Sequence, residues 1–335
     1  DRTLYIKVVR GFLKEGDTIT VKFGDKSKGS PGMRLQTFCE ESYEFHTLVD
    51  PIATYCYQPM PEQPTIKIVP GPAERFLAIG PTIRAVGEPF QIKIKGEDKW
   101  GNPTNLCDYE FDAISTCKIE GLPKKVTLKP GEFTATLSDL RVQTAEDFTV
   151  EFTNDVNNIA FETNPIRIEE KPHSRHFWGD LHGQSEETIG TNSAEAYFKF
   201  ARDLAFVDVS GHQGNDFQIT TDFWKHLDEL CKKFNQDGKF IAIPGYEWSG
   251  NTGLGGDRNI YFPTEGRTLR RSSHALVSDH SDISTDCNSA TELFSAFAEN
   301  DESDVVVYAH CGGRYADIEL AHDGRFEKSM EIHSS

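Results

Sequence analysis

The chain has 335 residues and a formal net charge of −18, from 35 Lys and Arg against 53 Asp and Glu. This acidic balance argues against a protein that binds nucleic acid by neutralising phosphates, so we expect no nucleic-acid partner. Hydrophobic residues make up 37% and aromatic residues 11% of the chain, which is enough to bury cores and excludes global disorder. No run reaches the roughly 18–20 apolar residues of a membrane helix, so we expect no membrane partner either.

The cysteine pattern gives an expectation about the compartment. There are seven cysteines, an odd number, and no Cys-x-x-Cys pair, which disfavours a disulfide framework or a zinc ribbon. Cys107 and Cys117 could still pair across a hairpin. Unpatterned thiols are typical of a reducing compartment, which predicts a cytoplasmic protein. The sequence opens on Asp1 in strand-like residues, so we expect a processed or truncated start, and a removed signal peptide stays open.

The first half of the chain has the pattern of β-structure. Apolar and polar residues alternate at 19–23, 90–94 and 148–152, which predicts strands with one buried face. Turn-forming Gly, Pro, Asn and Asp separate such runs, and no long helical pattern interrupts them. We predict two all-β, sandwich-like domains, 1–65 and 66–170. Their expected role is to pack against the rest of the chain or to supply a homo-oligomer contact.

From residue 171 the pattern changes to an alternation of short apolar runs and amphipathic helices. Such alternation with fully apolar strands predicts a parallel sheet covered by helices. The first helix has Tyr197, Phe200, Ala201 and Leu204 on its apolar face, with Thr191 or Ser193 as its cap. The predicted helices are 193–204, 221–235 and 289–299, and the predicted strands are 177–181, 206–210, 240–243, 259–262, 305–308 and 330–333.

Potential metal ligands follow four of these strands. His182, His212 and His310 each lie just past the end of a different predicted strand, and Glu247 lies a few residues past the strand 240–243, in the loop GYEWS. In an α/β barrel the carboxyl ends of the strands meet at one mouth, where active sites lie. Imidazoles and carboxylates that converge there can hold a divalent metal and leave positions open for water and substrate.

The segments around these residues resemble the motifs of the PHP (polymerase and histidinol phosphatase) superfamily of metal-dependent hydrolases. GDLHGQS at 179–185, SGHQ at 210–213, GYE at 245–247 and YAHCGGR at 308–314 are similar to its successive strand-end motifs. The whole chain resembles a microbial branch in which β-domains precede the PHP barrel. The resemblance implies that residues 171–335 form a distorted α/β, (β/α)7-type barrel. Because the closing Asp-x-His motif is not found, we expect the barrel to be incomplete at its C-terminus.

The resemblance also implies a ligand set. His182 would bind a first metal, His310 a second, and Glu247 would bridge the two. His212 would bind a third metal or orient the catalytic water. Gln184 stands where the motif has its second His, and would be a weaker ligand through its amide oxygen. The implied cofactor is one or two divalent ions, Mn, Zn or Fe.

Further residues are candidates for the same site. Asp257 and His274 both compete for a ligand position near the fourth strand. Asp180, two residues before His182, could anchor that imidazole as a hydrogen-bond acceptor. Arg314 follows a pair of glycines and would suit a phosphate or a carboxylate, although a surface ion pair is an equal alternative. Glu331 and His333 share one face of the last predicted strand.

These residues together predict a metal-dependent hydrolase that acts on a small-molecule substrate with a metal-activated water. His212 would be a ligand or a proton shuttle. We expect phosphoester hydrolysis, the commonest chemistry of the resembling superfamily, with amide or other C–N hydrolysis as the alternative. A different class of function also stays open, namely a non-catalytic binding or assembly protein with a degenerate barrel.

Overall fold

The computed structural model describes residues 3–334, and the chain divides into two compact units after Thr37. Residues 3–37 contain neither helix nor strand. The strand predicted at 19–23 is therefore wrong, and Ile19, Val21 and Phe23 are 53%, 41% and 55% exposed. An alternating pattern makes a strand only where a neighbouring strand satisfies its backbone and another layer covers its apolar face.

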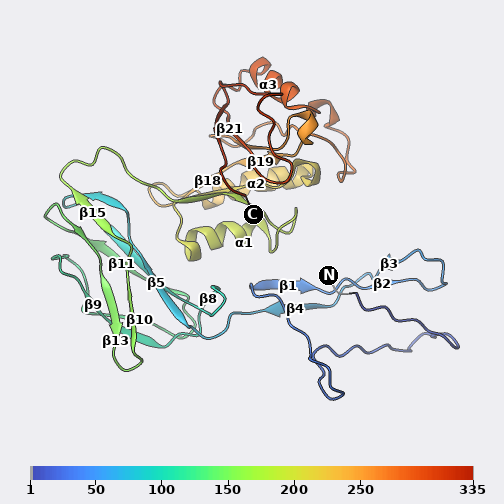
Figure 1. The fold of residues 1–335 in the computed structure, drawn as a ribbon, viewed down its shortest axis with the longest axis horizontal. Coiled ribbons are helices and arrows are strands. Elements are labelled where there is room, and N and C mark those ends of the chain that lie inside the picture. The colour runs from blue at the N-terminus through green and yellow to red at the C-terminus, as the bar shows by residue number, and fades with distance from the viewer. Residues whose placement is uncertain (1–2, 335) are drawn as a thin grey trace. The chain divides into compact units, whose positions relative to one another are not determined.

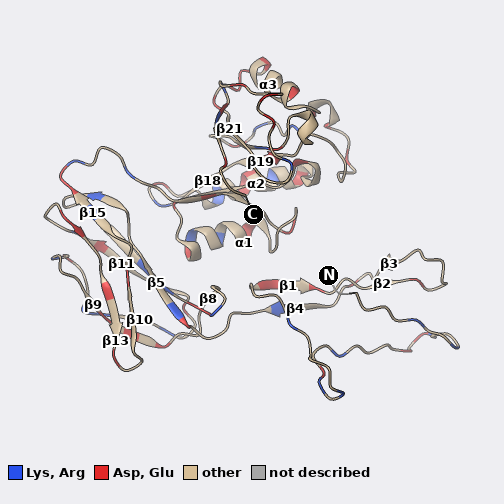
Figure 2. Cartoon of the chain, in the orientation of Figure 1, with Lys and Arg blue, Asp and Glu red and all other residues tan. Residues whose placement is uncertain are grey.

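The second unit begins with two small antiparallel ladders. β1 (Glu40–Glu44) pairs with β4 (Thr65–Ile68), and β2 (Leu48–Val49) pairs with β3 (Gln58–Pro59) (Figure 1). Three of the five residues of β1 are Glu, and the first part of this strand is red in Figure 2. Neither ladder has a buried face. The described part of the predicted domain 1–65 is thus not sandwich-like, because two-stranded ladders alone cannot enclose a core.

The stretch from Arg75 to Glu169 is an all-β region around one hydrophobic core. Its sheets have the strand orders β10-β9-β13-β14, β11-β7-β5 with β8 on β7, and β12-β15-β6. Phe90, Ile92 and Ile94 of β7 are 0–4% exposed, which confirms the alternation there. The strands are β5 (Arg75–Ile79), β6 (Ile83–Ala85), β7 (Phe90–Glu97), β8 (Pro103–Thr104), β9 (Tyr109–Ile114), β10 (Lys125–Leu128), β11 (Thr134–Leu140), β12 (Asp147–Phe148), β13 (Glu151–Asn154), β14 (Ile159–Glu162) and β15 (Ile166–Glu169).

The three predicted helices are confirmed to within a few residues. They are α1 (Ala194–Phe200), α2 (Thr221–Phe234) and α3 (Ala290–Glu299), and each begins after a Ser or Thr whose hydroxyl accepts a backbone N–H of the first turn. Ser193 caps α1, as one of the two predicted alternatives. The buried aromatic of α1 is Phe198, whereas Phe200, predicted to be buried, is 45% exposed. A π-helical turn, Ala201–Ala205, follows α1.

The strands of the C-terminal region form two separate open sheets. β16 (Gly179–Gly183), β17 (Val209–His212) and β18 (Ile241–Ile243) are parallel. β19 (Gly245–Trp248), β20 (Arg258–Tyr261) and β21 (Val306–Ala309) are antiparallel, and β22 (Glu327–Met330) pairs with β21 in parallel. The described residues contain no closed barrel, so the predicted (β/α)7 PHP-type barrel is wrong. β19 and β20 are joined without an α-helix, and so short a link favours antiparallel neighbours over a βαβ crossover.

The C-terminal region buries a large aromatic core and a fully enclosed ion pair. Trp248, Phe297 and Phe326 are at most 2% exposed. Arg258 Nε lies 3.0 Å from Glu327 Oε1, with side chains 0% and 3% exposed, so Arg258 is structural and does not face solvent. This pair joins β20 to β22, two strands whose ends carry candidate site residues.

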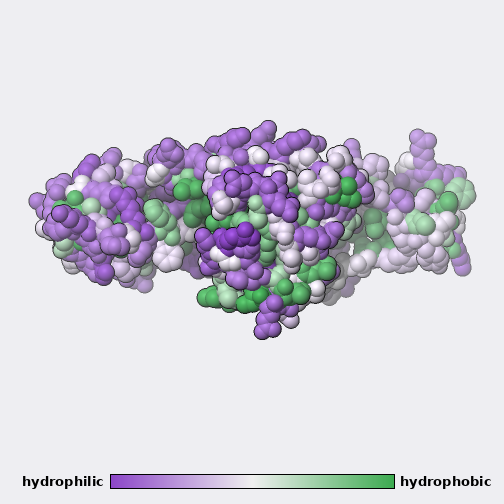
Figure 3. All heavy atoms as spheres, turned by 90° about the horizontal axis from the view of Figure 1, so that it is seen from above, coloured by the Kyte–Doolittle hydropathy of each residue, from purple (hydrophilic) through white to green (hydrophobic). Residues whose placement is uncertain are grey.

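The surface has no single dominant charged or apolar feature on the faces drawn. Lys and Arg are scattered over the elements in Figure 2, and Figure 3 shows hydrophobic atoms as separate green patches within a mostly hydrophilic face. No helix among residues 3–334 is long and apolar enough to cross a membrane. Among the same described residues all seven cysteines are free, so the disulfide considered between Cys107 and Cys117 does not form.

Candidate metal centre

Five acidic and histidine side chains from separate stretches meet at one end of the C-terminal strands. His182 lies in β16, Glu247 in β19 and Asp257 just before β20, while His310 follows β21 and Glu331 follows β22. They form two overlapping groups that share His310, one with His182 and Glu331 and the other with Glu247 and Asp257. In each group the candidate ligand atoms lie within 4.8 Å of one another. The three residues on which the sequence argument rested most are thus brought together.

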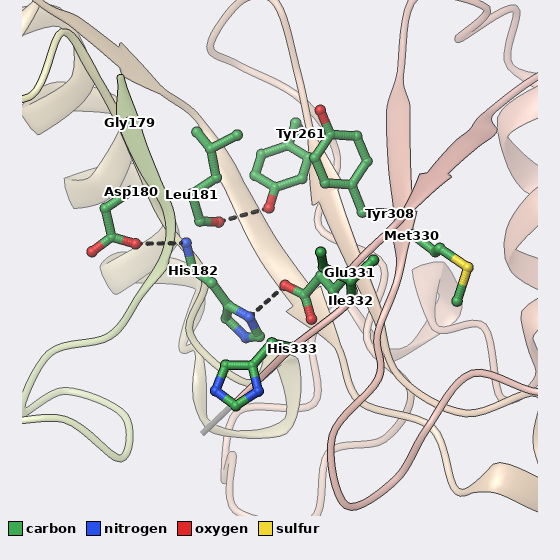
Figure 4. A pocket seen from close by; sticks show the side chains of 10 residues that line it. All are labelled: Gly179, Asp180, Leu181, His182, Tyr261, Tyr308, Met330, Glu331, Ile332 and His333. Carbon is green, nitrogen blue, oxygen red and sulfur yellow. Dashed lines mark hydrogen bonds and ion pairs between the residues drawn. The ribbon is translucent and has the colours of Figure 1, made fainter. Parts of the chain in front are cut away.

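The distances show which atoms face one another. Glu247 Oε2 lies 3.7 Å from His182 Nε2, and its Oε1 lies 3.9 Å from His310 Nε2. Glu331 Oε1 is 2.6 Å from His182 Nδ1, and its Oε2 is 3.9 Å from His310 Nε2 (Figure 4 shows the first of these contacts). Two ligands on one ion, each at ~2.0–2.2 Å, lie up to about 4.2 Å apart. Small side-chain rotations would therefore place these atoms around a common ion.

Neighbouring polar groups hold the carboxylates in place. Asn215 Nδ2 donates to Glu247 Oε2 at 2.8 Å, and Asn259 Nδ2 donates to Glu331 Oε1 at 2.6 Å. Arg314 Nε donates to Asp257 Oδ2 at 3.1 Å. Such outer partners orient the groups that bind a metal and tune their affinity for it. Asn259 stands opposite Glu247 in the β19–β20 ladder, so one strand pair carries both a candidate ligand and the donor to another.

The concentration of carboxylates in the cluster fits a cation. Asp257 Oδ1 and Glu331 Oε2 are buried without a hydrogen-bond partner among the described residues. Burial and the neighbouring Glu247 carboxylate raise the pKa of Asp257. Burial opposes protonation of His182, but hydrogen bonds to Glu247 and Glu331 outweigh it and raise its pKa to about 10. Each of these shifts shows carboxylates held close together, and a divalent ion would relieve their repulsion.

Two residues predicted for the site, His212 and His274, lie apart from both groups. His212 is 1% exposed, and its Nε2 lies 2.8 Å from Ser185 Oγ. Burial lowers the pKa of His212 to about 4, so it stays neutral near pH 7. His274 is held between Asp282 and Asp286 at 3.0 and 2.7 Å. Of the two candidates near the fourth strand, Asp257 therefore joins the cluster and His274 does not.

The remaining predicted residues touch the cluster in ways that the sequence did not indicate. Asp180 Oδ1 accepts the backbone N–H of His182 at 3.1 Å, so it does not anchor the imidazole, and Glu331 does. Gln184 directs its Nε2 at Glu247 Oε2, 3.5 Å away, while its Oε1 accepts from a threonine. Its amide oxygen is thus already engaged. Arg314 pairs through its Nε with Asp257, and its guanidinium lies 5.4 Å from the ring centre of Phe217.

The sequence analysis missed Asn215 and Asn259, and it gave Glu331 as a candidate without a role. Asn215 and Asn259 donate to the carboxylates, but an isolated Asn carries no sequence signal for such a role. Asn215 lies three residues beyond His212, in the same strand-end segment, and that position was the one available hint. Glu331 was indicated by its place on the last predicted strand.

Comparison with known proteins gives relatives but no activity. Residues 155–313 match the profile of a family described as "Protein of unknown function (DUF3604)", a stretch that holds His182, Glu247 and His310. An uncharacterized protein of Chlamydia pneumoniae is 25% identical over 272 residues, covering 78% of this chain and 43% of that protein. One of Chlamydia trachomatis is 23% identical over 245 residues, covering 70% and 39%. The chain thus spans about two fifths of the length of these relatives.

Among solved structures, two fragments of intimin show weak likeness. The D0-D1 domain of intimin aligns with a TM-score of 0.22 and 12% identity, over 29% of this chain and 49% of that chain. The D00-D0 domain aligns with a TM-score of 0.23 and 12% identity, over 32% and 56%.

Proposed function

We propose that the chain is a metal-dependent hydrolase whose centre lies among His182, Glu247, Asp257, His310 and Glu331. The observation that carries the proposal is the pair of buried carboxylate oxygens, on Asp257 and Glu331, that have no hydrogen-bond partner among the described residues. Such oxygens are costly in a protein interior unless a donor or a cation meets them. The resemblance of the motifs to those of the PHP superfamily supports this proposal only through the site residues. It does not extend to a closed barrel.

The chain's own residues would hold one or two ions and orient what binds to them. Glu247 has one oxygen toward His182 and the other toward His310, so it can serve both groups. Asn215 and Asn259 keep the Glu247 and Glu331 carboxylates turned inward. When bound, a divalent ion such as Mn, Zn or Fe supplies an acidified water and polarises the oxygen under attack. A small-molecule phosphoester or amide is compatible with this chemistry.

In this proposal His212 positions the chain and does not transfer protons. Its Nδ1 accepts the backbone N–H of Gly214 at 3.2 Å, and its Nε2 bonds to the fully buried Ser185. Both nitrogens are therefore engaged away from the cluster. The Ser185 bond ties the segment after β16 to the end of β17, close to where Asn215 reaches Glu247.

A second candidate function is a non-catalytic binding or assembly protein. The observation that favours it is the set of exposed apolar side chains in residues 3–37, where Val9 and Phe12 are 81% and 76% exposed. Exposed apolar residues of this kind are typical of surfaces that contact other proteins. This role, which includes a homo-oligomer contact through the β-rich part, needs no metal.

Metal analysis of the purified full chain separates the two functions. We expect about one or two Mn, Zn or Fe ions per chain, lost in a variant with His182→Ala and Glu247→Ala. The matched control is His226→Ala with Glu229→Ala, an exposed His–Glu pair on α2 whose nitrogen and oxygen lie 3.7 Å apart. The control should keep its metal. A metal-free wild type that also takes up no added ion would refute the hydrolase and favour the binding protein.

We also infer a reducing compartment, the cytoplasm, for the protein. The support is chemical, since seven thiols without a disulfide framework are typical of such compartments.

A further inference from the structure

A cavity of about 380 Å³ opens beside the candidate metal centre and shares two of its residues. His182 and Glu331 form one wall, where their 2.6 Å contact faces the cavity (Figure 4). The other walls come from β16, β20 and β21, from Met330 at the end of β22 and from the residues that follow it. A molecule in this cavity would therefore lie against the groups proposed to hold the ion.

Another wall of the cavity is aromatic and apolar, in contrast to the charged wall formed by His182 and Glu331. The rings of Tyr261 and Tyr308 lie 5.1 Å apart and tilted by 58°. The Tyr261 hydroxyl donates to the carbonyl of Leu181 at 2.6 Å, so its polar end is satisfied and its ring is held in place. Met330 and Ile332 complete this wall. Tyrosine rings and a methionine thioether favour aromatic or other apolar groups.

The charged lining has the wrong sign for a phosphate. The polar residues of the cavity are Asp180, His182, Glu331 and His333, and among the described residues no Lys or Arg lines it. Neither Arg258 nor Arg314 lines the cavity: Arg258 is buried in its pair with Glu327, and the Nε of Arg314 donates to Asp257. Enzymes that bind phosphoryl groups usually add Arg or Lys to their metal ions. Here a phosphate dianion would face the carboxylates of Asp180 and Glu331, while His182 beside them is already paired with Glu331.

We infer that the substrate is an uncharged carboxylic ester or amide whose aromatic or apolar group occupies this cavity, and not a phosphate ester. This inference rests on the proposed hydrolase function. In the reaction, the water oxygen bonds to the carbonyl carbon and the bond from that carbon to the ester oxygen or amide nitrogen breaks. The leaving atom takes a proton from the water, so a carboxylic acid and an alcohol or amine are released.

Binding to the metal-free full chain tests the cavity without relying on activity. Acetanilide and phenyl phosphate are suitable probes because both present a phenyl ring, one beside a neutral amide and the other beside a dianion. By saturation-transfer NMR on chelator-treated protein, we expect acetanilide to bind at least fivefold more tightly than phenyl phosphate. Tyr308→Ala should weaken acetanilide binding at least fivefold, and Met330→Ala, at a 59% exposed side chain, should weaken it less. Tyr55→Ala, at a tyrosine 80% exposed and outside the cavity, is the control.

Turnover by the Mn-loaded full chain then distinguishes failure of the substrate inference from failure of the proposed hydrolase function. We expect phenyl acetate and acetanilide to be hydrolysed faster than phenyl phosphate at equal concentration, after subtraction of the rates without protein. Retained metal with preferential binding or hydrolysis of phenyl phosphate would overturn the substrate inference and leave the hydrolase standing. Loss of the metal centre itself, by the metal analysis above, would overturn both. If no probe is turned over, acetanilide binding that is lost in Tyr308→Ala supports the cavity assignment, and absent binding refutes it.

Discussion

Replacing Glu327 by Gln tests the buried ion pair that joins β20 to β22. Arg258 is 0% exposed, and besides Glu327 it donates to the carbonyls of Gly255, Gly256 and Ala321. Glu327→Gln keeps the shape of the side chain but leaves the guanidinium charge without its counter-charge. Removing one partner of a buried pair costs about 3–5 kcal/mol. Because Gln still offers an acceptor oxygen, we expect about 3 kcal/mol, a factor of roughly 100 or more in the unfolding equilibrium.

Urea unfolding followed by tryptophan fluorescence measures this loss, since Trp224 and Trp248 are buried in the same core as Phe326. The matched control is Glu195→Gln, which breaks the exposed pair with Lys233, whose side chains are 50% and 57% exposed. An exposed pair is worth less than about 1 kcal/mol. A Glu327→Gln loss no larger than that of the control would refute the reasoning. We also expect weaker metal binding, because β22 leads directly to Glu331.

Three further predictions concern the site. Free Mn or Zn at 100 times its dissociation constant should stabilise the wild type by about 2.7 kcal/mol and raise its Tm, with no rise in the variant lacking His182 and Glu247, as read by thermal unfolding. Asn259→Ala removes the donor to Glu331 and should weaken metal affinity by about 10–100-fold in calorimetric titration, and unchanged affinity would contradict the role of Asn259. Because burial lowers the pKa of His212 to about 4 in the folded state, against ~6.5 unfolded, stability should fall as pH drops from ~6.5 to ~4, on the order of 3 kcal/mol. In His212→Gln we expect this fall in stability between pH ~6.5 and ~4, measured by the urea midpoint, to disappear. The same pH dependence in wild type and variant would contradict the role given to the burial of His212.

The helices were the most predictable part of the fold because two independent local signals coincide there. Apolar spacing marks the buried face of α2, and a Ser or Thr caps each of the three helices. Both signals are properties of a few consecutive residues. The buried face of α1 is formed by Ala194, Phe198 and Ala201 at the spacing i, i+4, i+7, whereas the prediction centred that face on Phe200.

Strand pairing was less predictable because it depends on residues far away in sequence. β19 was missed, since all four of its residues are buried and show no alternation, and Glu247 was taken to lie in a loop. Because β19 was missed, a parallel sheet was predicted for this region, whereas β19, β20 and β21 are antiparallel. At 19–23 the alternation was present but no strand formed, because periodicity alone does not provide a partner.

The site could be predicted in part, because strand ends concentrate polar residues whatever the direction of the strands. His182, Glu247 and His310 meet although residues 3–334 do not form the barrel that was expected to bring them together. His212 was indistinguishable from them in sequence, and only its burial beside Ser185 separates it. The supporting Asn215 and Asn259 could not be found, because an amide gains its role only from the carboxylate it meets in three dimensions.

The five clustered side chains are spread from residue 182 to residue 331, on strands that are remote along the backbone. A protease cut between His182 and Glu247, for example at the exposed residues around Asp237, would place them on different polypeptides. If the proposed centre holds an ion, the two pieces would keep it only while they stay associated. Measuring the metal content after limited digestion would thus show whether the two fragments remain associated, because neither fragment alone contains the complete set of ligands.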